Sequence, residues 1–529
     1  MATTVMAGTR NATETVTAAT GGRVALVAVP LLLALATLAA LIVFLTPPYP
    51  SDQINYLDAA RDFPSVPRNP AIVHQYARLG LVLPMAVSMT ILGYSQAAYY
   101  IVPVLAAVAL VLGVYALGSL LFARAVGLGA AVLTVGNTAI FVDATAPLPD
   151  LLAATLFVWA VVLAIAVRQG RSAVVATPRR RVAAMLAIGV ILGWSYLARE
   201  FIVFVWPLIP VILFRRVSIR DLFWIAVPLG AIGLAEMALN QHIFGDPLAR
   251  LRVASEHGSG VVPEEAAATY QNKRRLWYLA QLGVAIGDVP EGAWLNAALG
   301  AAVAGALVWP RRLGLLLLWI ALLYVPLVLL GGVLNPDAPM LRLFKVRYWY
   351  PIVPAILLGG VAAAWLATRF VAGRLGASEH RRGLIAGALA LVLALVPVAI
   401  AHAARADSSG YRANGATQME AFRSWLGDQQ GRVDTIWADS RTVRVARIFT
   451  SAPFGGRLWE GAFHTLVPAD GTTRPETGDH VLLYSPHSAL CGHCRQGSQR
   501  IFGSPVRVPP TWTLAFSTAD GVVQVYEVP

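Results

Sequence analysis

The sequence predicts a polytopic α-helical membrane protein of about eleven transmembrane helices, with a small extracytoplasmic C-terminal α/β domain. Hydrophobic residues make up 57% of the 529 residues, charged residues only 13%, and the mean hydropathy is +0.64. One soluble core cannot enclose so much apolar side chain, and the apolar residues recur in runs long enough to cross a bilayer. From Arg405 onward the composition becomes polar and rich in turn residues. We therefore divide the chain into a membrane module, residues 1–404, and a soluble domain, residues 405–529.

The first apolar run, Val24 to Thr46, follows Arg23 and is long enough for one span. No small-residue cleavage signature follows it, which favours a retained helix over a removable signal peptide. The segment Leu79 to Gly93 is shorter, because its residues would form a helix of about 22 Å against a hydrocarbon core of roughly 30 Å. We interpret this segment as re-entrant or interfacial. The further spans expected are Tyr100–Phe122, Val126–Val142, Leu151–Val167, Val182–Ala198, Phe201–Phe214, Leu222–Leu239, Trp294–Trp309, Leu313–Leu334, Tyr350–Ala367 and Leu384–His402.

Arginines gather in the short loops on one side of this arrangement. They are Arg124, Arg168, Arg171, Arg179, Arg180, Arg181, Arg215, Arg216, Arg220, Arg311, Arg312, Arg369, Arg374, Arg381 and Arg382. Short loops rich in basic residues remain in the cytoplasm, so the N-terminus is expected inside and the C-terminal domain outside. These loops account for much of the net charge of +13, and nucleic-acid binding is not expected.

Five segments face the outside in this topology, and we expect the chemistry there. They are the first outer loop 47–78, the turn Asp143–Asp150, the tip Arg199–Glu200, the long outer loop 240–292 and the segment Asn335–Trp349. Loops longer than about 15 residues are commonly lids or binding elements. The long loop, which contains Glu264, Glu265 and Tyr270, is therefore expected to cover the site.

Short apolar alternations in the C-terminal domain predict β-strands at Val433–Trp437, His480–Tyr484, Trp512–Phe516 and Val522–Val528. Helical spacing predicts a helix at Thr417–Gly427. The only two cysteines, Cys491 and Cys494, are separated by Gly492 and His493. Their spacing fits a structural disulfide in an oxidising compartment, and it also permits a thiol–disulfide centre. A zinc site would need two more ligands.

Asp52 follows the first span by six residues and is the candidate catalytic base. A carboxylate in this place can accept a proton from an acceptor hydroxyl, and it can also cap a short interfacial helix that begins at Gln53. Asp58 and Asp150 are the candidates for a second carboxylate. Asp150 starts a predicted span, where a helix N-terminus favours negative charge for structural reasons alone.

Arg199 and Glu200 interrupt an apolar stretch that is too long for one span. They fit an ion pair at a bend, and the arginine equally fits a bidentate clamp for a phosphate. Lys345 and Arg347 precede a span together with Tyr348. This group fits an aromatic belt with snorkelling basic residues, and it also fits a site for an anionic headgroup.

The order of these spans, outer loops and charged motifs resembles that of the GT-C superfamily of integral-membrane glycosyltransferases, particularly the protein O-mannosyltransferase and aminoarabinose-transferase type. About the first 370 residues match in layout. The motifs that carry the resemblance are Ser51-Asp52-Gln53-Ile54-Asn55-Tyr56 in the first loop, Gly93-Tyr94-Ser95, Pro149-Asp150, Arg199-Glu200, and Arg347-Tyr348 with Pro351. Gln53 stands where the family usually has a second acidic residue, which argues against a metal-dependent or two-carboxylate mechanism.

The resemblance implies an inverting transfer of a sugar from a polyprenyl-phosphate donor to an acceptor hydroxyl at the outer face of the membrane, with Asp52 as general base. Departure of the polyprenyl phosphate needs cations rather than an acid, and the candidates are Arg199, Lys345 and Arg347. The candidates for donor or acceptor contacts are Tyr56, His74, Arg78, Glu200 and Tyr348. No ligand cluster argues for a bound metal, and a divalent metal stays open.

A transporter or flippase of lipid-linked sugars is the alternative, because it would share the many spans and basic loops. Such a protein is expected to carry ionisable groups at mid-membrane and broken helices in both halves. Here the charges lie mainly at span ends, which favours an enzyme. The alanine- and arginine-rich, lysine-poor composition is typical of a GC-rich bacterium, so the plasma membrane is the expected location. Mannose or arabinose is the expected sugar, and a glycan, lipid or protein is the expected acceptor.

Overall fold

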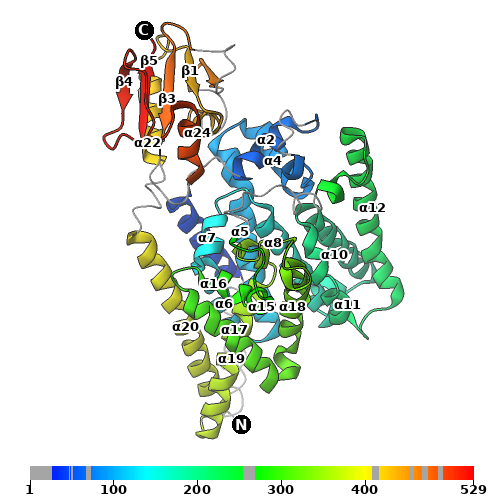
Figure 1. Ribbon diagram of the computed structural model, residues 1–529. Coiled ribbons are helices and arrows are strands. Elements are labelled where there is room, and N and C mark those ends of the chain that lie inside the picture. The colour runs from blue at the N-terminus through cyan, green and yellow to red at the C-terminus, as the bar shows by residue number, and fades with distance from the viewer. Residues whose placement is uncertain are drawn as a thin grey trace, which may run out of the picture.

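The computed structural model of the protein describes residues 27–46, 48, 52–66, 73–253, 268–407, 416–451, 458–466, 475–485 and 492–529. A helical bundle forms most of the molecule, and a small domain with a β-sheet lies at one end of it (Figure 1). The α-helices of the bundle are Val27–Val43, α4 (Leu79–Leu92), α5 (Gln96–Leu121), α6 (Arg124–Gly136), α7 (Thr138–Asp143), α8 (Pro149–Arg168), α9 (Ser172–Val175), α10 (Pro178–Ala198), α11 (Leu208–Leu213), α12 (Ile219–Phe244), α15 (Arg275–Leu279), α16 (Gln281–Gly287), α17 (Gly292–Val308), α18 (Pro310–Val328), α19 (Val353–Arg374) and α20 (Glu379–Asp407). Two 3₁₀ segments, η2 (Glu200–Val205) and η4 (Val346–Trp349), and a π-helical turn η3 (Leu329–Val333) complete it.

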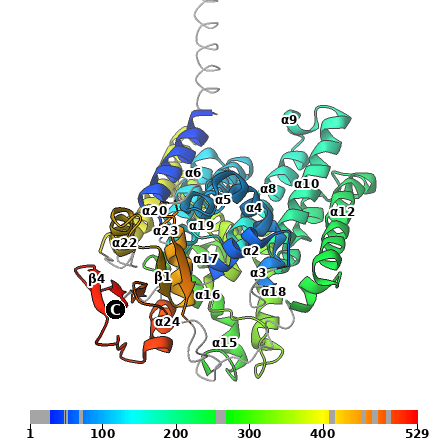
Figure 2. The same cartoon turned by 90° about the horizontal axis from the view of Figure 1, so that it is seen from above.

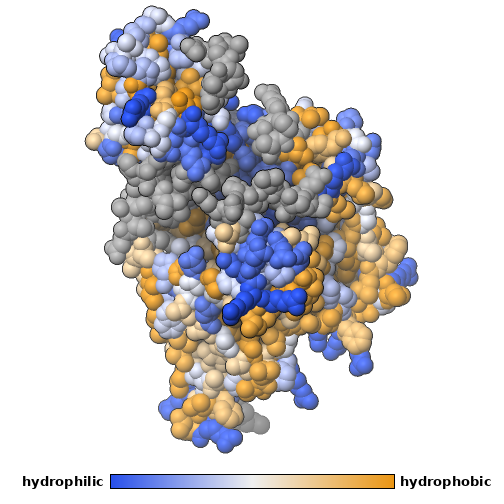
Figure 3. All heavy atoms as spheres, viewed as in Figure 1, coloured by the Kyte–Doolittle hydropathy of each residue, from blue (hydrophilic) through white to orange (hydrophobic). Residues whose placement is uncertain are grey.

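Seven helices in the described part of the chain are long and apolar enough to cross a membrane, namely α5, α8, α10, α12, α18 with its π-helical turn, α19 and α20. Shorter apolar helices match the other predicted spans, and the protein is a multi-pass membrane protein. The number of eleven crossings stays a prediction. Hydrophobic residues cover much of the flank of the bundle, whereas hydrophilic residues are frequent on the C-terminal domain (Figure 3).

Helix boundaries follow local capping signals. Ser95 accepts a hydrogen bond from the Ala98 amide at the start of α5, and Thr177 does the same for Arg180 at the start of α10. The segment expected to be interfacial forms α4, which has 14 residues, so its short length is confirmed. Its Gly80 approaches the backbone at the end of α10 so closely that a Cβ would lie 2.2 Å from the Ala198 nitrogen.

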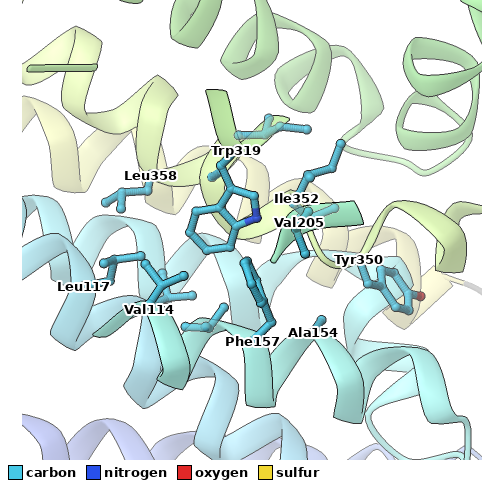
Figure 4. Packing of buried hydrophobic residues seen from close by; sticks show 14 of the residues in the cluster. Val114, Leu117, Ala154, Phe157, Val205, Trp319, Tyr350, Ile352 and Leu358 are labelled. Atoms are coloured by element: carbon cyan, nitrogen blue, oxygen red, sulfur yellow. The ribbon is translucent and has the colours of Figure 1, made fainter. Parts of the chain in front are cut away.

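The centre of the bundle is packed around α8. The ring of Phe157 on α8 meets Trp319 of α18 edge to face, with ring centroids 5.3 Å apart. Leu117 and Leu358 lie around this pair (Figure 4). Close packing of this kind fixes the helices relative to one another.

The C-terminal domain has a five-stranded sheet in the order β2-β1-β3-β5-β4. Its strands are β1 (Thr435–Ala438), β2 (Ala462–Thr465), β3 (His480–Tyr484), β4 (Thr513–Ser517) and β5 (Val523–Glu527), and its helices are α22 (Ala416–Asp428), α23 (Ser440–Phe449) and α24 (Gly492–Phe502). The pairs β1/β2 and β1/β3 are parallel, and β3/β5 and β4/β5 are antiparallel. The predicted α/β domain, its four strands and the helix α22 are confirmed; β2, α23 and α24 are additional elements.

Candidate active site

Asp52 is the first residue of α2 (Asp52–Asp62), a polar helix that packs on α4 at the end of the bundle where the C-terminal domain lies (Figures 1 and 2). The helix begins at Asp52 itself and not at Gln53. Asp52 Oδ2 accepts a hydrogen bond from Arg347 Nη1 at 3.0 Å, and Oδ1 accepts one from Gln75 Nε2 at 3.3 Å. The side chain of Asp52 is 33% exposed, so the carboxylate is held in place yet reachable.

The environment of Asp52 determines its protonation. Burial raises the pKa of the Asp52 carboxyl, but the charge and hydrogen bond of Arg347, together with the charges of His74 and Arg78, outweigh burial. The pKa of Asp52 therefore lies below its ordinary value, and the group is an anion at neutral pH. Only the anionic form can take a proton from a hydroxyl.

Two arginines, one partly and one fully buried, share one carboxylate next to this position. Arg78 Nε lies 3.4 Å from Glu200 Oε1, and Arg250 Nε lies 3.5 Å from the same oxygen. Arg78 also donates a hydrogen bond to the hydroxyl of Tyr56 on α2. Burial raises the pKa of Tyr56 to about 12, so its hydroxyl stays neutral. Arg250, whose side chain is 2% exposed, donates through Nη1 to Glu236 Oε1 at 2.7 Å.

These arginines line a cavity of about 330 Å³. Its wall consists of His74, Ala77, Arg78, Tyr196, Arg199, Glu200, Phe201, Val203, Phe204, Arg250, Leu251, Val253, Leu330, Met340, Leu341 and Tyr348. The cavity therefore combines cationic groups with aromatic and aliphatic side chains. Cationic groups suit an anion such as a phosphate, and apolar walls suit hydrocarbon groups.

Arg199 is the third arginine of this wall, and its charge is already paired. Its Nε lies 2.8 Å from Asp150 Oδ1, and the two side chains are 5% and 1% exposed. Asp150 lies in the first turn of α8, and Arg199 directly follows α10. The guanidinium Cζ also lies 4.9 Å and 5.1 Å from the ring centroids of Phe201 and Tyr348. Arg199 therefore forms its ion pair with Asp150 rather than with its neighbour Glu200, and its predicted role as a phosphate clamp stays a prediction.

A second group of cations lies around η4. Arg342, Lys345 and Arg347 line a small hollow of about 70 Å³ together with Tyr270 and Tyr348. Tyr348 and Met340 line both this hollow and the larger cavity, so the two are neighbours. Burial lowers the pKa of Lys345, and the charges of Arg347 and Arg342 add to this effect. Within the described residues, Arg342 and Lys345 form no ion pair with a carboxylate.

No protein-family model matches the chain, and no curated protein matches it. Among solved structures, the crystal structure of ArnT from Cupriavidus metallidurans in the apo state matches with a TM-score of 0.55 and 13% sequence identity, over 96% of this chain and 98% of that chain. The chain has the GT-C fold. The fold implied by the sequence motifs is thereby confirmed. Two further matches are ArnT bound to undecaprenyl phosphate (TM-score 0.49, 14% identity, 96% and 98% of the two chains) and the oligosaccharyltransferase AglB from Archaeoglobus fulgidus in complex with an inhibitory peptide and a dolichol-phosphate (TM-score 0.46, 12% identity, 82% and 64%).

On this GT-C fold, most candidate residues from distant parts of the sequence gather around the cavity and the hollow. They are Asp52, Tyr56, His74, Arg78, Asp150, Arg199, Glu200, Lys345, Arg347 and Tyr348. Asp58 is different, because its carboxylate binds Arg444 of the C-terminal domain at 2.8 Å and Arg61 at 3.1 Å. It lines neither the cavity nor the hollow as described above, and it belongs to the contact between the two parts of the chain.

Several groups at the site were not predicted from the sequence. Arg250 and Glu236 form a buried pair, and a carboxylate inside a predicted span was a signal that could have revealed it. Asp143 is a further buried carboxyl; burial raises its pKa to about 6, and the Tyr350 hydroxyl donates to it at 2.6 Å.

Two expectations lie wholly or partly outside the described residues. Glu264 and Glu265 of the long outer loop fall there, as do Cys491 and the side chain of Cys494, so the predicted disulfide stays a prediction. In the parts of the chain that the structure describes, no group of three or more His, Cys, Asp or Glu side chains is placed to hold a metal ion.

Proposed function

We propose that the protein is an inverting glycosyltransferase that moves a sugar from a polyprenyl-phosphate donor to an acceptor hydroxyl at the outer face of the membrane, with Asp52 as general base. The observation that carries the proposal is the anionic Asp52 carboxylate, bound to Arg347, next to a cavity lined by arginines and apolar side chains. The GT-C fold, shared with ArnT, supports the same assignment.

The proposed reaction is a displacement at the anomeric carbon of the donor sugar. The acceptor oxygen forms a bond to the anomeric carbon while the bond from that carbon to the phosphate oxygen breaks. The hydroxyl proton passes to Asp52, and the negative charge stays on the departing polyprenyl phosphate. The oxygen attacks from the face opposite to the leaving group, so the configuration of the carbon inverts.

The balance of charge favours one group of cations for the phosphate. In the larger cavity, Arg199 is matched by Asp150, while Arg78 and Arg250 are matched by Glu200 and Glu236. Around η4 the positive charge exceeds the negative charge among the described residues. Arg342, Lys345 and Arg347 line one hollow, and the carboxylate of Asp52 pairs with Arg347. We therefore assign the donor phosphate to Arg347 and Lys345, with Arg342 adding charge and Arg78 at the edge. Arg199 is assigned a positioning role, because it forms an ion pair with Asp150 and lies over the ring of Tyr348.

The hydrocarbon chain and the acceptor are assigned to different surfaces. The apolar part of the cavity wall, which includes Phe204, Leu251 and Leu341, suits the first isoprene units of the donor. The acceptor hydroxyl must reach the solvent-exposed part of the Asp52 carboxylate. An outward-facing catalytic end requires an N-terminus in the cytoplasm and the C-terminal domain outside, as the arginine-rich loops predict.

The test is transfer of radiolabelled sugar by the purified protein in lipid, from polyprenyl-phosphate mannose or polyprenyl-phosphate arabinofuranose to an acceptor pool extracted from membranes. The key variant is Asp52→Asn, which keeps the shape of the side chain and removes the base. Asp62→Asn at the other end of α2 is the matched control, because Asp62 binds Arg61 and not Arg347. Transfer that is lost only in Asp52→Asn, with donor binding retained, supports the proposal. Unchanged transfer in Asp52→Asn would move the base elsewhere, and movement of intact donor across the bilayer without transfer would favour the flippase.

A further inference from the structure

The helix that carries Asp52 is held from two sides. From the membrane side, α4 supplies Leu81, Val82 and Met85, which belong to the same buried hydrophobic cluster as Ile54 and Leu57 of α2. From the other side, α23 of the C-terminal domain supplies Val445, Ile448 and Phe449 to that cluster. The cluster is therefore continuous from the membrane module through α2 into the soluble domain.

One arginine fixes the orientation of α2 within this contact. Arg444 of α23 donates through Nε to Asp58 Oδ2 at 2.8 Å and through Nη2 to Asn55 Oδ1 at 2.6 Å. Asn55 and Asp58 follow Asp52 by three and six residues, which is close to one and two helical turns. A guanidinium that bridges two successive turns resists both rotation and sliding of the helix, because its planar fork has a fixed geometry.

The partners of this bridge are themselves restrained. Asp58 Oδ1 accepts a hydrogen bond from the Tyr94 hydroxyl at 3.2 Å and lies 3.1 Å from Arg61 Nη1. The Asp58 side chain is only 11% exposed and that of Arg444 is 22% exposed, so the ion pair is shielded from solvent. A shielded pair with charged hydrogen bonds has a more defined geometry than a surface pair.

We propose that Arg444 is a positioning residue, through which the C-terminal domain holds Asp52 in register with Arg347 and the donor cavity. The inference rests on the proposed function of Asp52 as base. The domain is then part of the catalytic machinery, because the first turn of α2 carries the carboxylate and the domain holds the next two turns. Misplacement of a reacting group by about 1 Å can lower a rate by about 100-fold, so small rotations of α2 matter.

The test compares Arg444→Gln with Arg447→Gln in the full chain in lipid. Arg447 lies one turn further along α23, is exposed, and donates to the Phe463 carbonyl within its own domain, so it is the matched control. We expect Arg444→Gln to lower kcat by about 10-fold to 100-fold with the donor KM changed less than about twofold. Arg447→Gln should leave both values unchanged. Arg444→Lys, which keeps the charge but not the fork, should fall between wild type and Arg444→Gln.

A double-mutant cycle with Asp58→Asn separates positioning from general damage to the fold. If Arg444 acts through Asp58, the double variant loses no more activity than the more impaired single variant. Multiplied losses, or an equal fall in Arg447→Gln, would overturn the inference.

Hydrogen exchange provides a readout that does not depend on activity. Exchange in the peptide 52–62 should accelerate in Arg444→Gln while the strands of the C-terminal sheet stay protected. Unchanged exchange in α2 would refute the inference even if no glycosyl transfer is found. Retained transfer in Asp52→Asn would refute the proposed function of Asp52 as base. The hydrogen-exchange result would then still show whether Arg444 stabilises α2.

Discussion

The buried ion pair between Arg199 and Asp150 allows a quantitative test of the site. Replacing Arg199 with Met removes the ion-pair partner of the Asp150 carboxylate, whose side chain is 1% exposed. Removal of one member of a buried pair costs about 3–5 kcal/mol. Because the charge of Arg347 also acts on Asp150, we expect the lower end of that range, about 3 kcal/mol. This loss corresponds to a rise in the unfolding equilibrium constant of about 100-fold.

The matching measurement is chemical denaturation in detergent micelles, followed by tryptophan fluorescence. The double variant Arg199→Met/Asp150→Leu removes both charges, so it should recover most of the loss. Arg181→Met is the control, because its pair with Asp221 at 2.7 Å is more exposed, at 36% and 14%, and should contribute less than about 1 kcal/mol. A loss below about 1 kcal/mol in Arg199→Met, or a double variant that loses the sum of the two single losses, would refute the reasoning.

Three further outcomes are expected. Arg347→Gln removes the main cation that lowers the pKa of Asp52, so that pKa rises and the acid limb of the kcat/KM profile moves to higher pH; a limb in the wild-type position would contradict the assigned contact. Lys345→Gln removes one of the cations assigned to the donor phosphate, and donor KM should rise about 10-fold with a smaller change in kcat, as measured by initial rates; an unchanged KM would place the donor phosphate elsewhere. Gly332 has φ 138° and a Cβ there would lie 2.2 Å from the Tyr278 ring, so Gly332→Ala should cost about 1–3 kcal/mol by denaturation, and a neutral result would contradict this packing.

The bundle could be predicted from the sequence because the length and polarity of an apolar run are local properties. Runs such as Val182–Ala198 and Tyr350–Ala367 coincide with α10 and α19, and the short length of α4 was correct for the same reason. The predicted break at Arg199 is also present, as the end of α10. Local sequence does not reveal that the chain continues after this break as the 3₁₀ segment η2, Glu200–Val205.

The C-terminal domain was predicted less completely. β2 (Ala462–Thr465) is a mostly exposed edge strand and has little alternation to detect. α23 could have been found, because Asp439 precedes it and accepts hydrogen bonds from the amides of Arg441 and Thr442, a recognisable helix-start signal. Its apolar residues at Val443, Val445, Ala446, Ile448 and Phe449 are compatible with one helical face.

The sequence names candidate site residues one by one, but it does not predict their partners. The contact between Asp52 and Arg347 joins positions 295 residues apart, and the contact between Asp58 and Arg444 joins positions 386 apart. Hydrophobic periodicity carries no information about such pairs. For this reason Asp58 was proposed as a second carboxylate of the site, although its pairing with Arg444 places it at the contact between the two parts of the chain.

The pairing of Asp52 with Arg347 has a consequence for the proposed reaction. A carboxylate whose pKa is lowered is ionised and available, yet it is a weak base, so it cannot remove a hydroxyl proton before bond formation begins. Phosphate is a good leaving group, and cleavage of the glycosyl bond gives the anomeric carbon the character of an oxocarbenium ion. The attacking hydroxyl becomes acidic only as its oxygen bonds to that carbon, and a weak base then suffices. In the proposed reaction, negative charge that develops on the leaving phosphate would attract Arg347, which would weaken its interaction with Asp52 and raise the basicity of Asp52 during proton transfer.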